Sequence, residues 1–516
     1  MATSSMLYNP LSITQSTKKR SPSIARAQKE VVLNPPHTSS SSQATCLSES
    51  LSNLLHLHVD APPRTEDLRF SKRVTSHDIK EKYSAPTKSP KEVISDKWRE
   101  IQGSSDWENL LDPLHPGLRR EIIKYGEFAQ ATYDAFDFDS FSEYCGSCRY
   151  NKHKLFGELG LNQNGYKVTE YIYAMSHVEI PRWLERSRLA DKWSKDSNWI
   201  GYVAYSDDEE TLRIGRRDIL VAWRGTVAPS EWYEDFQREL EPIGHGNDHH
   251  AKVEHGFLSI YTSKSESTRY NKSSASEQVM SEIRKLVNLY RDRGEEVSLT
   301  ITGHSLGGAL ALLNAHEASS TIPNLPVSVI SFGAPRVGNG AFRDELRQKG
   351  VKTLRVVVKQ DIVPKMPGLV FNETLDRFDE HITGALEWVY THVGAELKLD
   401  VQSSPYLKHG FNFLGFHMVE TYLHLVDGFL STRSNFRVDA KRDVALVNKA
   451  CDMLVDELRV PHSWNQLANK GLVCNEHGRW VKPRRAPEDI PSPIGGGHKH
   501  NLTVEEAQEG HEGLVH

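Results

Sequence analysis

The sequence has few cysteines, no long apolar run and little net charge, and each of these shortages excludes a class of protein. Five cysteines among 516 residues are few and odd in number, which argues against the disulfide framework of a small secreted protein. No stretch approaches the ~18 consecutive apolar residues of a membrane-spanning helix. A net charge of -5 gives no general basis for binding nucleic acid or an anionic membrane surface.

Acidic residues are absent from the first 29 positions, which are rich in serine and threonine and carry five basic residues: Lys18, Lys19, Arg20, Arg26 and Lys29. This leader has no apolar core of the kind that a secretory signal needs. A basic, hydroxyl-rich and acid-poor leader is typical of an organelle transit peptide, and the plastid is favoured because arginine does not dominate. We therefore predict that the first 29 residues are a transit peptide that directs the protein to the chloroplast. The alternative is that they are a plain disordered tail.

The composition changes twice along the chain and predicts three parts. Residues 1–85 are rich in Ser, Pro and Lys and are unpatterned, as in a transit peptide followed by a disordered linker. Residues 86–485 carry regular apolar patterns and predict a folded domain. Residues 486–516 turn rich in Pro and Gly and then polar, which predicts a disordered tail.

The patterned part alternates helical and β-branched segments. A helix is expected near Pro116, because apolar residues follow at helical spacing (Leu118, Ile122, Tyr125 and Ala129), and a second helix is expected to end at Gly294. Strands are expected at 197–206, 217–226, 296–302, 327–333 and 353–359, the first two joined by a charged turn. Alternation of strand and helix at this spacing predicts an α/β fold.

Ser305 lies in Gly303-His304-Ser305-Leu306-Gly307, directly between a predicted strand and a predicted helix. A serine hydroxyl needs a strained, exposed position and a nearby base to act as a nucleophile, and glycines two residues away on each side make room for that turn. A bare Gly-X-Ser-X-Gly match is common by chance. The strand before it and the helix after it favour a nucleophile over a structural turn.

A nucleophile needs donors for the developing oxyanion. The first is expected to be the backbone N–H of Leu306, and the second to come from a loop after an earlier strand. The strand that begins at 219 ends in Arg224-Gly225-Thr226, where the glycine permits close backbone approach and Thr226 offers both an N–H and a hydroxyl. These residues indicate Thr226 and Leu306 as the oxyanion site.

The acid and the base are expected downstream of the nucleophile. Asp361 comes just after a β-branched strand, whereas its rivals Asp376 and Asp379 follow no strand. Five later histidines are candidate bases: His381, His392, His409, His417 and His424. His417 is favoured because it is expected at the start of a helix, and His424 reads as a packed neighbour. The order Ser305, Asp361, His417 is the chain order expected when the nucleophile lies on a Gly-X-Ser-X-Gly elbow, the sharp turn from strand to helix at Ser305.

Other reactive side chains give weaker signals. Cys145 and Cys148 have redox spacing, but no predicted strand leads into them, so we expect a local disulfide or two structural thiols. His498 and His500 could bind a metal ion weakly, and a histidine-bearing tail is the favoured interpretation. The chemistry that we expect from Ser305 requires neither a metal nor an organic cofactor.

Three segments occur in an order that resembles the class 3 lipases: GHSLGGALA (303–311), FGAPRVGN (332–339) and QDIVPKMPG (360–368). Further segments, among them VAWRGTVAPSEWYEDF (221–236) and HMVETYLHLVDGF (417–429), resemble the plant class I phospholipase A1 group, and within it the plastid gamma type. The resemblance covers roughly 90–485.

The resemblance implies an α/β-hydrolase fold with a central, mostly parallel sheet flanked by helices, and it makes 86–485 a lipase catalytic domain. It implies a triad of Ser305, Asp361 and His417 that cleaves the sn-1 ester of phosphatidylcholine. The implied substrate range also includes plastid galactolipids or triacylglycerol. The released fatty acid could feed jasmonate synthesis. The implied partners are membrane lipids, met through peripheral membrane contact.

The segment right after Thr226 corresponds to the lid of that family and carries Trp232, Tyr233 and Phe236. An aromatic stretch beside an oxyanion loop is suited to cover an acyl groove and to swing out at a lipid surface. A structural helix is the alternative. For the whole chain, the alternatives are a neutral-lipid lipase or a lysophospholipase with the same triad, or a catalytically silent lipid-binding module.

Overall fold

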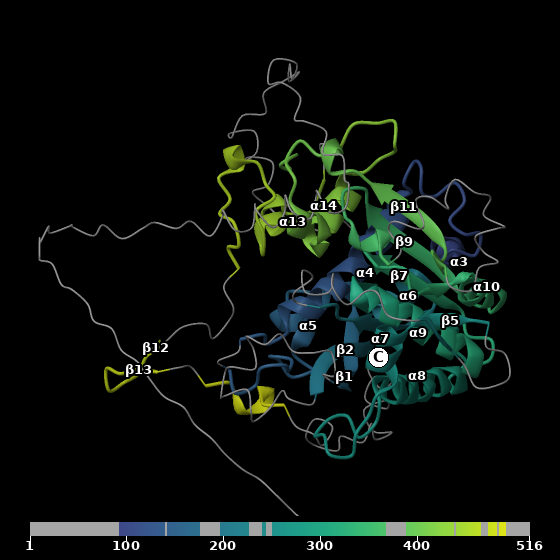
Figure 1. Ribbon diagram of the computed structural model, residues 1–516, viewed down its shortest axis with the longest axis horizontal. Coiled ribbons are helices and arrows are strands. Elements are labelled where there is room, and N and C mark those ends of the chain that lie inside the picture. Colours follow the sequence, from purple (N-terminus) through teal and green to yellow (C-terminus); the bar gives the residue numbers. More distant parts are fainter. Residues whose placement is uncertain are drawn as a thin grey trace, which may run out of the picture. The chain divides into compact units, whose positions relative to one another are not determined.

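The computed structural model describes most of the chain after residue 91 (Figure 1). The described residues are 92–139, 142–175, 197–226, 240–243, 250–367, 389–437, 440–465, 473–481 and 484–491. They include all of the proposed triad and oxyanion residues. The transit peptide, Trp232, Tyr233, Phe236 and the two C-terminal histidines lie outside them.

A seven-stranded sheet forms the centre of the fold, in the order β1-β2-β3-β6-β7-β9-β11. The first two pairings, β1 with β2 and β2 with β3, are antiparallel, and the strands from β3 to β11 are parallel. The strands are β1 (Tyr166–Met175), β2 (Ser197–Ser206), β3 (Arg217–Trp223), β6 (Val297–His304), β7 (Val327–Phe332), β9 (Lys352–Val358) and β11 (Ala395–Leu399). The five predicted strands are confirmed, and β1 and β11 are additional.

Helices cover both faces of this sheet, as predicted. Alternate strand residues such as Leu220, Ile330 and Phe332 belong to a core that includes α4 (Pro116–Asp134) and α14 (Val419–Gly428). The intervening residues point to the other face because side chains alternate along a strand. There α8 (Ala275–Asp292) and α9 (Leu306–Thr321) pack against the sheet and against each other (Figure 1).

The long helices begin and end where local chemistry allows. Ser274 and Glu277 form a reciprocal capping box at the start of α8, and Gly294 follows its end with a φ of 78°. Pro116 is the first residue of α4, where a missing N–H costs nothing. Both helices were predicted from the sequence, because their capping residues and their apolar spacing can be recognised within the segment itself.

The buried hydroxyl of Tyr125 fixes α4 to the sheet. It donates to Oδ2 of Asp218 on β3 at 2.9 Å, and Thr302 Oγ1 on β6 donates to the Tyr125 carbonyl at 3.2 Å. Both interactions are buried, so they hold the helix in one position over the central strands. The position of α4 is important for the active site, because Tyr133 and Asp134 at its C-terminal end line the cavity described below.

One local prediction was wrong, and the two alternatives left open for Cys145 and Cys148 are now decided. The charged segment between β2 and β3 is a helix, α6 (Asp208–Ile214), because the Asp207 side chain caps it and Gly215 ends it with a φ of 78°. Cys145 and Cys148 form no disulfide and are buried thiols. Cys148 Sγ contacts the Tyr171 hydroxyl at 3.3 Å, and burial raises the pKa of this thiol to about 11, which confirms the structural-thiol alternative.

The remaining elements connect these layers. A second sheet has the order β10-β8-β5-β4, and β12 pairs with β13. The short strands are β4 (Leu240–Pro242), β5 (Lys252–Glu254), β8 (Gly338–Asn339), β10 (Tyr390–Thr391), β12 (Val473–Cys474) and β13 (Trp480–Val481). The other helices are α3 (Trp98–Ile101), α5 (Leu155–Glu158), α7 (His255–Thr262), α10 (Gly340–Gln348) and α13 (Phe413–His417). Short 3-10 turns are η1 (Ser95–Lys97), η2 (Asn162–Asn164), η5 (Val363–Lys365), η6 (Val401–Ser403), η7 (Val444–Asn448), η8 (Asp456–Leu458) and η9 (Pro487–Asp489).

The predicted division of the chain into three parts stays a prediction, but η9 bears on its last boundary. Asp489 Oδ1 accepts a hydrogen bond from the Asn151 backbone N–H at 2.8 Å, and Lys154 pairs with Glu488. The first residues of the segment predicted as a disordered tail are therefore attached to the folded part. Among the described residues, no helix is long and apolar enough to cross a bilayer.

Candidate active site

Ser305 forms a sharp turn between β6 and α9. Its backbone has φ 56° and ψ -127°, a combination that a non-glycine residue adopts only under strain. The Ser305 N–H donates to the Phe332 carbonyl at the end of β7 at 2.9 Å, which fixes the turn to the neighbouring strand. The predicted elbow is therefore present, at the carboxyl end of a central parallel strand.

The two flanking glycines are required by close backbone approach. A Cβ on Gly303 would lie 2.3 Å from the backbone carbonyl carbon and oxygen of Gly307, and a Cβ on Gly307 would lie 2.2 Å from the Trp223 carbonyl oxygen. These contacts are with backbone atoms, which cannot rotate away. The elbow therefore tolerates no side chain at either position.

Replacement of Gly303 by alanine is expected to destabilise the protein by at least ~2 kcal/mol, because the added methyl group must displace backbone of α9. The measurement is the free energy of unfolding in urea. Gly410→Ala is the matched control, since nothing lies within 4 Å of a Cβ there, and it should change stability by less than ~0.5 kcal/mol. Equal stability of the two variants would contradict the close approach.

Asp361 and His417 are in direct contact with each other through their side chains. Asp361 follows β9, and its Oδ2 lies 2.6 Å from His417 Nδ1 and accepts a hydrogen bond from the Tyr422 hydroxyl at 2.6 Å. Its Oδ1 accepts from the Val363 N–H at 3.0 Å. The carboxylate is thus fully buried and held by three donors, and the predicted acid and base lie together.

The position of His417 in its helix was predicted wrongly. His417 is the last residue of the five-residue helix α13, and α14 begins two residues later, after Met418 adopts an extended backbone. The Asn412 side chain caps α13 by accepting from the Gly415 N–H at 2.9 Å. The break between the two helices turns the His417 ring toward Asp361.

The other described histidines do not compete with His417 as the base. His409 is exposed, and burial together with Arg355 and Arg336 holds the pKa of His392 well below its usual value. His424 is packed against Ser404, 2.8 Å from Nε2 to Oγ, and burial lowers its pKa to about 3, which confirms it as a packed neighbour. Asp376, Asp379 and His381 lie outside the described residues.

Thr226 and Leu306 lie in two segments beside Ser305, the first in a loop and the second in the first turn of a helix. Thr226 follows β3, and its buried Oγ1 has no hydrogen-bond partner among the described residues. Leu306 is the first residue of α9, where backbone N–H groups have no carbonyl partner within the helix. The loop after β3 and the start of α9 therefore both present hydrogen-bond donors at the carboxyl edge of the sheet.

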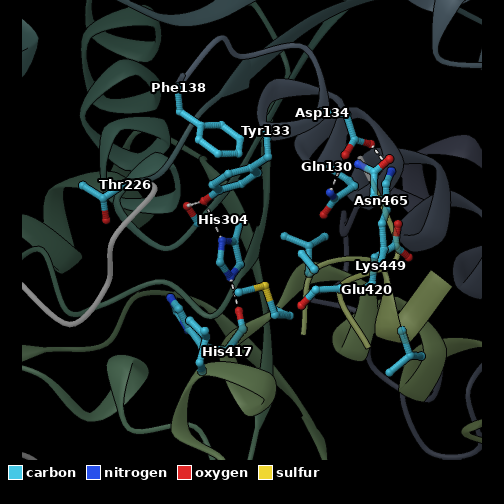
Figure 2. Close-up of a pocket in the computed structure, with 16 residues that line it drawn as sticks. Gln130, Tyr133, Asp134, Phe138, Thr226, His304, His417, Glu420, Lys449 and Asn465 are labelled. Carbon is cyan, nitrogen blue, oxygen red and sulfur yellow. Dashed lines mark hydrogen bonds and ion pairs between the residues drawn. The ribbon is translucent and has the colours of Figure 1, made fainter. Parts of the chain in front are cut away.

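A cavity of about 410 Å³ opens at this edge, and Thr226, His304 and His417 line it together (Figure 2). Its apolar lining consists of Phe138, Leu414, Met418, Val419, Val447 and Ala450. Its polar lining, beyond the three residues named first, consists of Gln130, Tyr133, Asp134, Glu420, Lys449, Ser463 and Asn465. The cavity is thus large enough for part of a lipid and has both apolar and polar walls.

Two tyrosines at the site were missed by the sequence analysis. Tyr422 donates to Asp361, and the Tyr133 hydroxyl lies 2.7 Å from His304 Nδ1. Neither position carries a motif, and a tyrosine within a helix reads as an ordinary core residue. The two tyrosines reach the active site only because the fold brings α4 and α14 next to the turn at Ser305.

A parallel sheet with a strained serine after a central strand and a buried Asp–His pair beside it defines an α/β hydrolase. The family described as Lipase (class 3) matches residues 220–371, which contain Ser305 and Asp361. Phospholipase A1-Igamma1, chloroplastic, from Arabidopsis thaliana is 47% identical over 80% of this chain and 83% of its own length. Phospholipase A1-Igamma2, chloroplastic, from the same plant is 45% identical over 78% of each chain.

The chain belongs to the phospholipase A1 family of the class 3 lipases, and it is accordingly a carboxylic-ester hydrolase. The predicted fold and family are confirmed, and the predicted chloroplast location agrees with the names of both relatives. Among solved structures, a lipase from Rhizopus microsporus var. chinensis is 21% identical, with a TM-score of 0.36, over 57% of this chain and 78% of that chain.

Proposed function

We propose that this protein is a phospholipase A1 that cleaves the sn-1 ester of phosphatidylcholine with Ser305 as nucleophile, His417 as base and Asp361 as the acid that orients it. The observation that carries the proposal is a pair of buried atoms without partners, His417 Nε2 and Thr226 Oγ1, in residues that line one cavity. A buried polar atom without a partner costs free energy unless a ligand uses it.

The mechanism follows from the positions of these groups. Asp361 binds His417 Nδ1–H, which leaves the lone pair of Nε2 free to take the proton of Ser305 as its hydroxyl attacks the ester carbonyl. No hydrogen bond from Ser305 Oγ to this nitrogen is formed among the described residues, as is common before substrate binds. The imidazolium then protonates the departing lysolipid, and water repeats the sequence on the acyl-enzyme.

The oxyanion that forms in each half-reaction is bound by the N–H groups of Thr226 and Leu306. Thr226 Oγ1, which has no partner in the described structure, supplies a third donor. Each such donor contributes about 3 kcal/mol to lowering the barrier. The macrodipole of α9 adds to this, because its positive end begins at Leu306.

The walls of the cavity support a lipid substrate. Phe138 and Leu414 line it and are 44% and 42% exposed, which gives the molecule two large apolar side chains at the entrance that a lipid surface would cover. We infer peripheral contact with plastid membranes at this entrance and include galactolipids and triacylglycerol as further substrates. No cofactor enters the reaction. Trp232, Tyr233 and Phe236 remain the proposed lid.

The regiospecificity is tested with position-labelled phosphatidylcholine, galactolipid and triacylglycerol, each carrying different acyl chains at sn-1 and sn-2, and lysophosphatidylcholine is assayed beside them. We expect the sn-1 fatty acid and the 2-acyl lysolipid to be the first products. First release of the sn-2 acid would rule out the A1 assignment. A rate on triacylglycerol far above that on both polar lipids would instead favour a neutral-lipid lipase, and a rate on lysolipid above both would favour a lysophospholipase.

A further inference from the structure

His304 lies between two groups that belong to different parts of the active site. Its Nε2 is 2.6 Å from the backbone carbonyl oxygen of His417, and its Nδ1 is 2.7 Å from the Tyr133 hydroxyl. Figure 2 shows the ring between these two partners. His304 is buried, and its ring centroid is 4.5 Å from that of His417. The two histidines therefore form a packed pair, although only His417 faces Asp361.

The partners define the protonation state of the His304 ring. A carbonyl oxygen only accepts hydrogen bonds, so Nε2 must carry the hydrogen, and in the neutral ring Nδ1 then accepts from the Tyr133 O–H. Burial, and secondly the nearby His417, holds the pKa of His304 well below its usual value, so the ring is neutral.

Tyr133 extends the connection to the oxyanion loop. Its hydroxyl forms a hydrogen bond with the Gly225 backbone, and a Cβ on Gly225 would lie only 2.2 Å from that hydroxyl and 2.6 Å from the His304 carbonyl oxygen. Only glycine at 225 allows the hydroxyl to lie there. Tyr133 belongs to the last turn of α4, which Tyr125 fixes to the sheet.

We propose that His304 and Tyr133 are positioning residues that fix the base His417 and the oxyanion loop to the nucleophile elbow. The chain of contacts runs from the Gly225 backbone through the Tyr133 hydroxyl and the His304 ring to the His417 carbonyl. The last link holds the backbone of the same residue whose ring must reach Ser305, so its loss moves the base. This inference rests on the proposed function, since it assigns His417 as the base.

Two amides of different length at 304 separate a positioning role from simple filling of space. Gln places its NH₂ near the position of His Nε2 and can donate to the His417 carbonyl, whereas Asn places it near Nδ1 and cannot reach. We expect His304→Asn to lower kcat on p-nitrophenyl butyrate by ~10- to 100-fold with KM changed less than ~2-fold, because misplacing a catalytic group by ~1 Å costs up to ~100-fold. His304→Gln should lose less than ~3-fold, and Tyr133→Phe ~5-fold.

The controls use the folded full-length chain. His477→Asn, at an exposed turn, should leave kcat unchanged, and all variants are compared at equal folded fraction from thermal unfolding. Wild-type kcat in both His304→Asn and Tyr133→Phe would overturn the proposal, and so would equal losses in the Gln and Asn variants. A wild-type protein that neither hydrolyses the ester nor reacts at Ser305 with a fluorophosphonate would overturn the proposed function, and this inference with it.

A second measurement does not depend on activity or on the folding of the Asn variant. In ¹⁵N-histidine spectra of the wild-type protein, with the His304 signal identified by its absence in His304→Gln, the ring should be neutral with hydrogen on Nε2 at pH 6. A protonated ring, or hydrogen on Nδ1, would contradict the assigned contacts and overturn the proposal.

Discussion

Replacement of Ser305 by alanine is expected to lower the rate of ester hydrolysis by at least ~10⁴-fold. The alanine removes the hydroxyl oxygen that attacks the ester, and His417 and Asp361 then have no nucleophile to activate. The oxyanion donors of Thr226 and Leu306 remain, so a small rate above that in water should persist. The hydrogen bond that holds the turn, from the Ser305 N–H to the Phe332 carbonyl, does not involve the hydroxyl, so the turn accepts the methyl group.

The rate is measured on a soluble ester and on phosphatidylcholine vesicles with purified protein. Ser267→Ala, on an exposed loop, is the matched control and should hydrolyse both substrates at the wild-type rate. Full activity in Ser305→Ala would contradict the triad assignment. If Ser267→Ala also lost activity, the loss in Ser305→Ala would not be specific to the nucleophile.

The elbow was predictable because its chemistry is local. Gly303, Ser305 and Gly307 lie within five residues, and the β-branched strand before them and the small residues after them are adjacent in sequence. The helix α8 was predictable for the same reason, since the residues that cap its start and the glycine that follows its end lie within or next to the segment. Patterns of this kind need no knowledge of distant contacts.

The site partners were predictable only in part. Asp361 was expected because it follows a strand, and the structure places it beside His417. The break after His417 was not expected, because the helical pattern continues through Met418 and the turn depends on packing of α13 against Asn412 and Met453. Tyr133 and Tyr422 act through contacts with residues 171 and 61 positions away, which no local pattern reveals.

Replacement of Asp361 by asparagine is expected to lower kcat by ~10⁴-fold while the fold is kept. Oδ2 of Asp361 faces His417 Nδ1 and the Tyr422 hydroxyl, and Oδ1 accepts from the Val363 N–H. If the amide oxygen stays on Val363, the NH₂ group faces Nδ1, which must then accept, so the ring hydrogen moves to Nε2. A base that already carries hydrogen on Nε2 cannot take the proton of Ser305.

If the amide turns the other way, its NH₂ group faces the Val363 N–H and two donors oppose each other, which costs about the free energy of an unpaired buried donor, ~1–3 kcal/mol. Neither orientation restores the carboxylate. Tyr422→Phe is the matched variant, because it removes one donor to Oδ2 and leaves the His417 tautomer unchanged, so kcat should fall by less than ~10-fold. Equal kcat in the two variants, at equal folded fraction, would show that the tautomer of His417 does not limit the reaction.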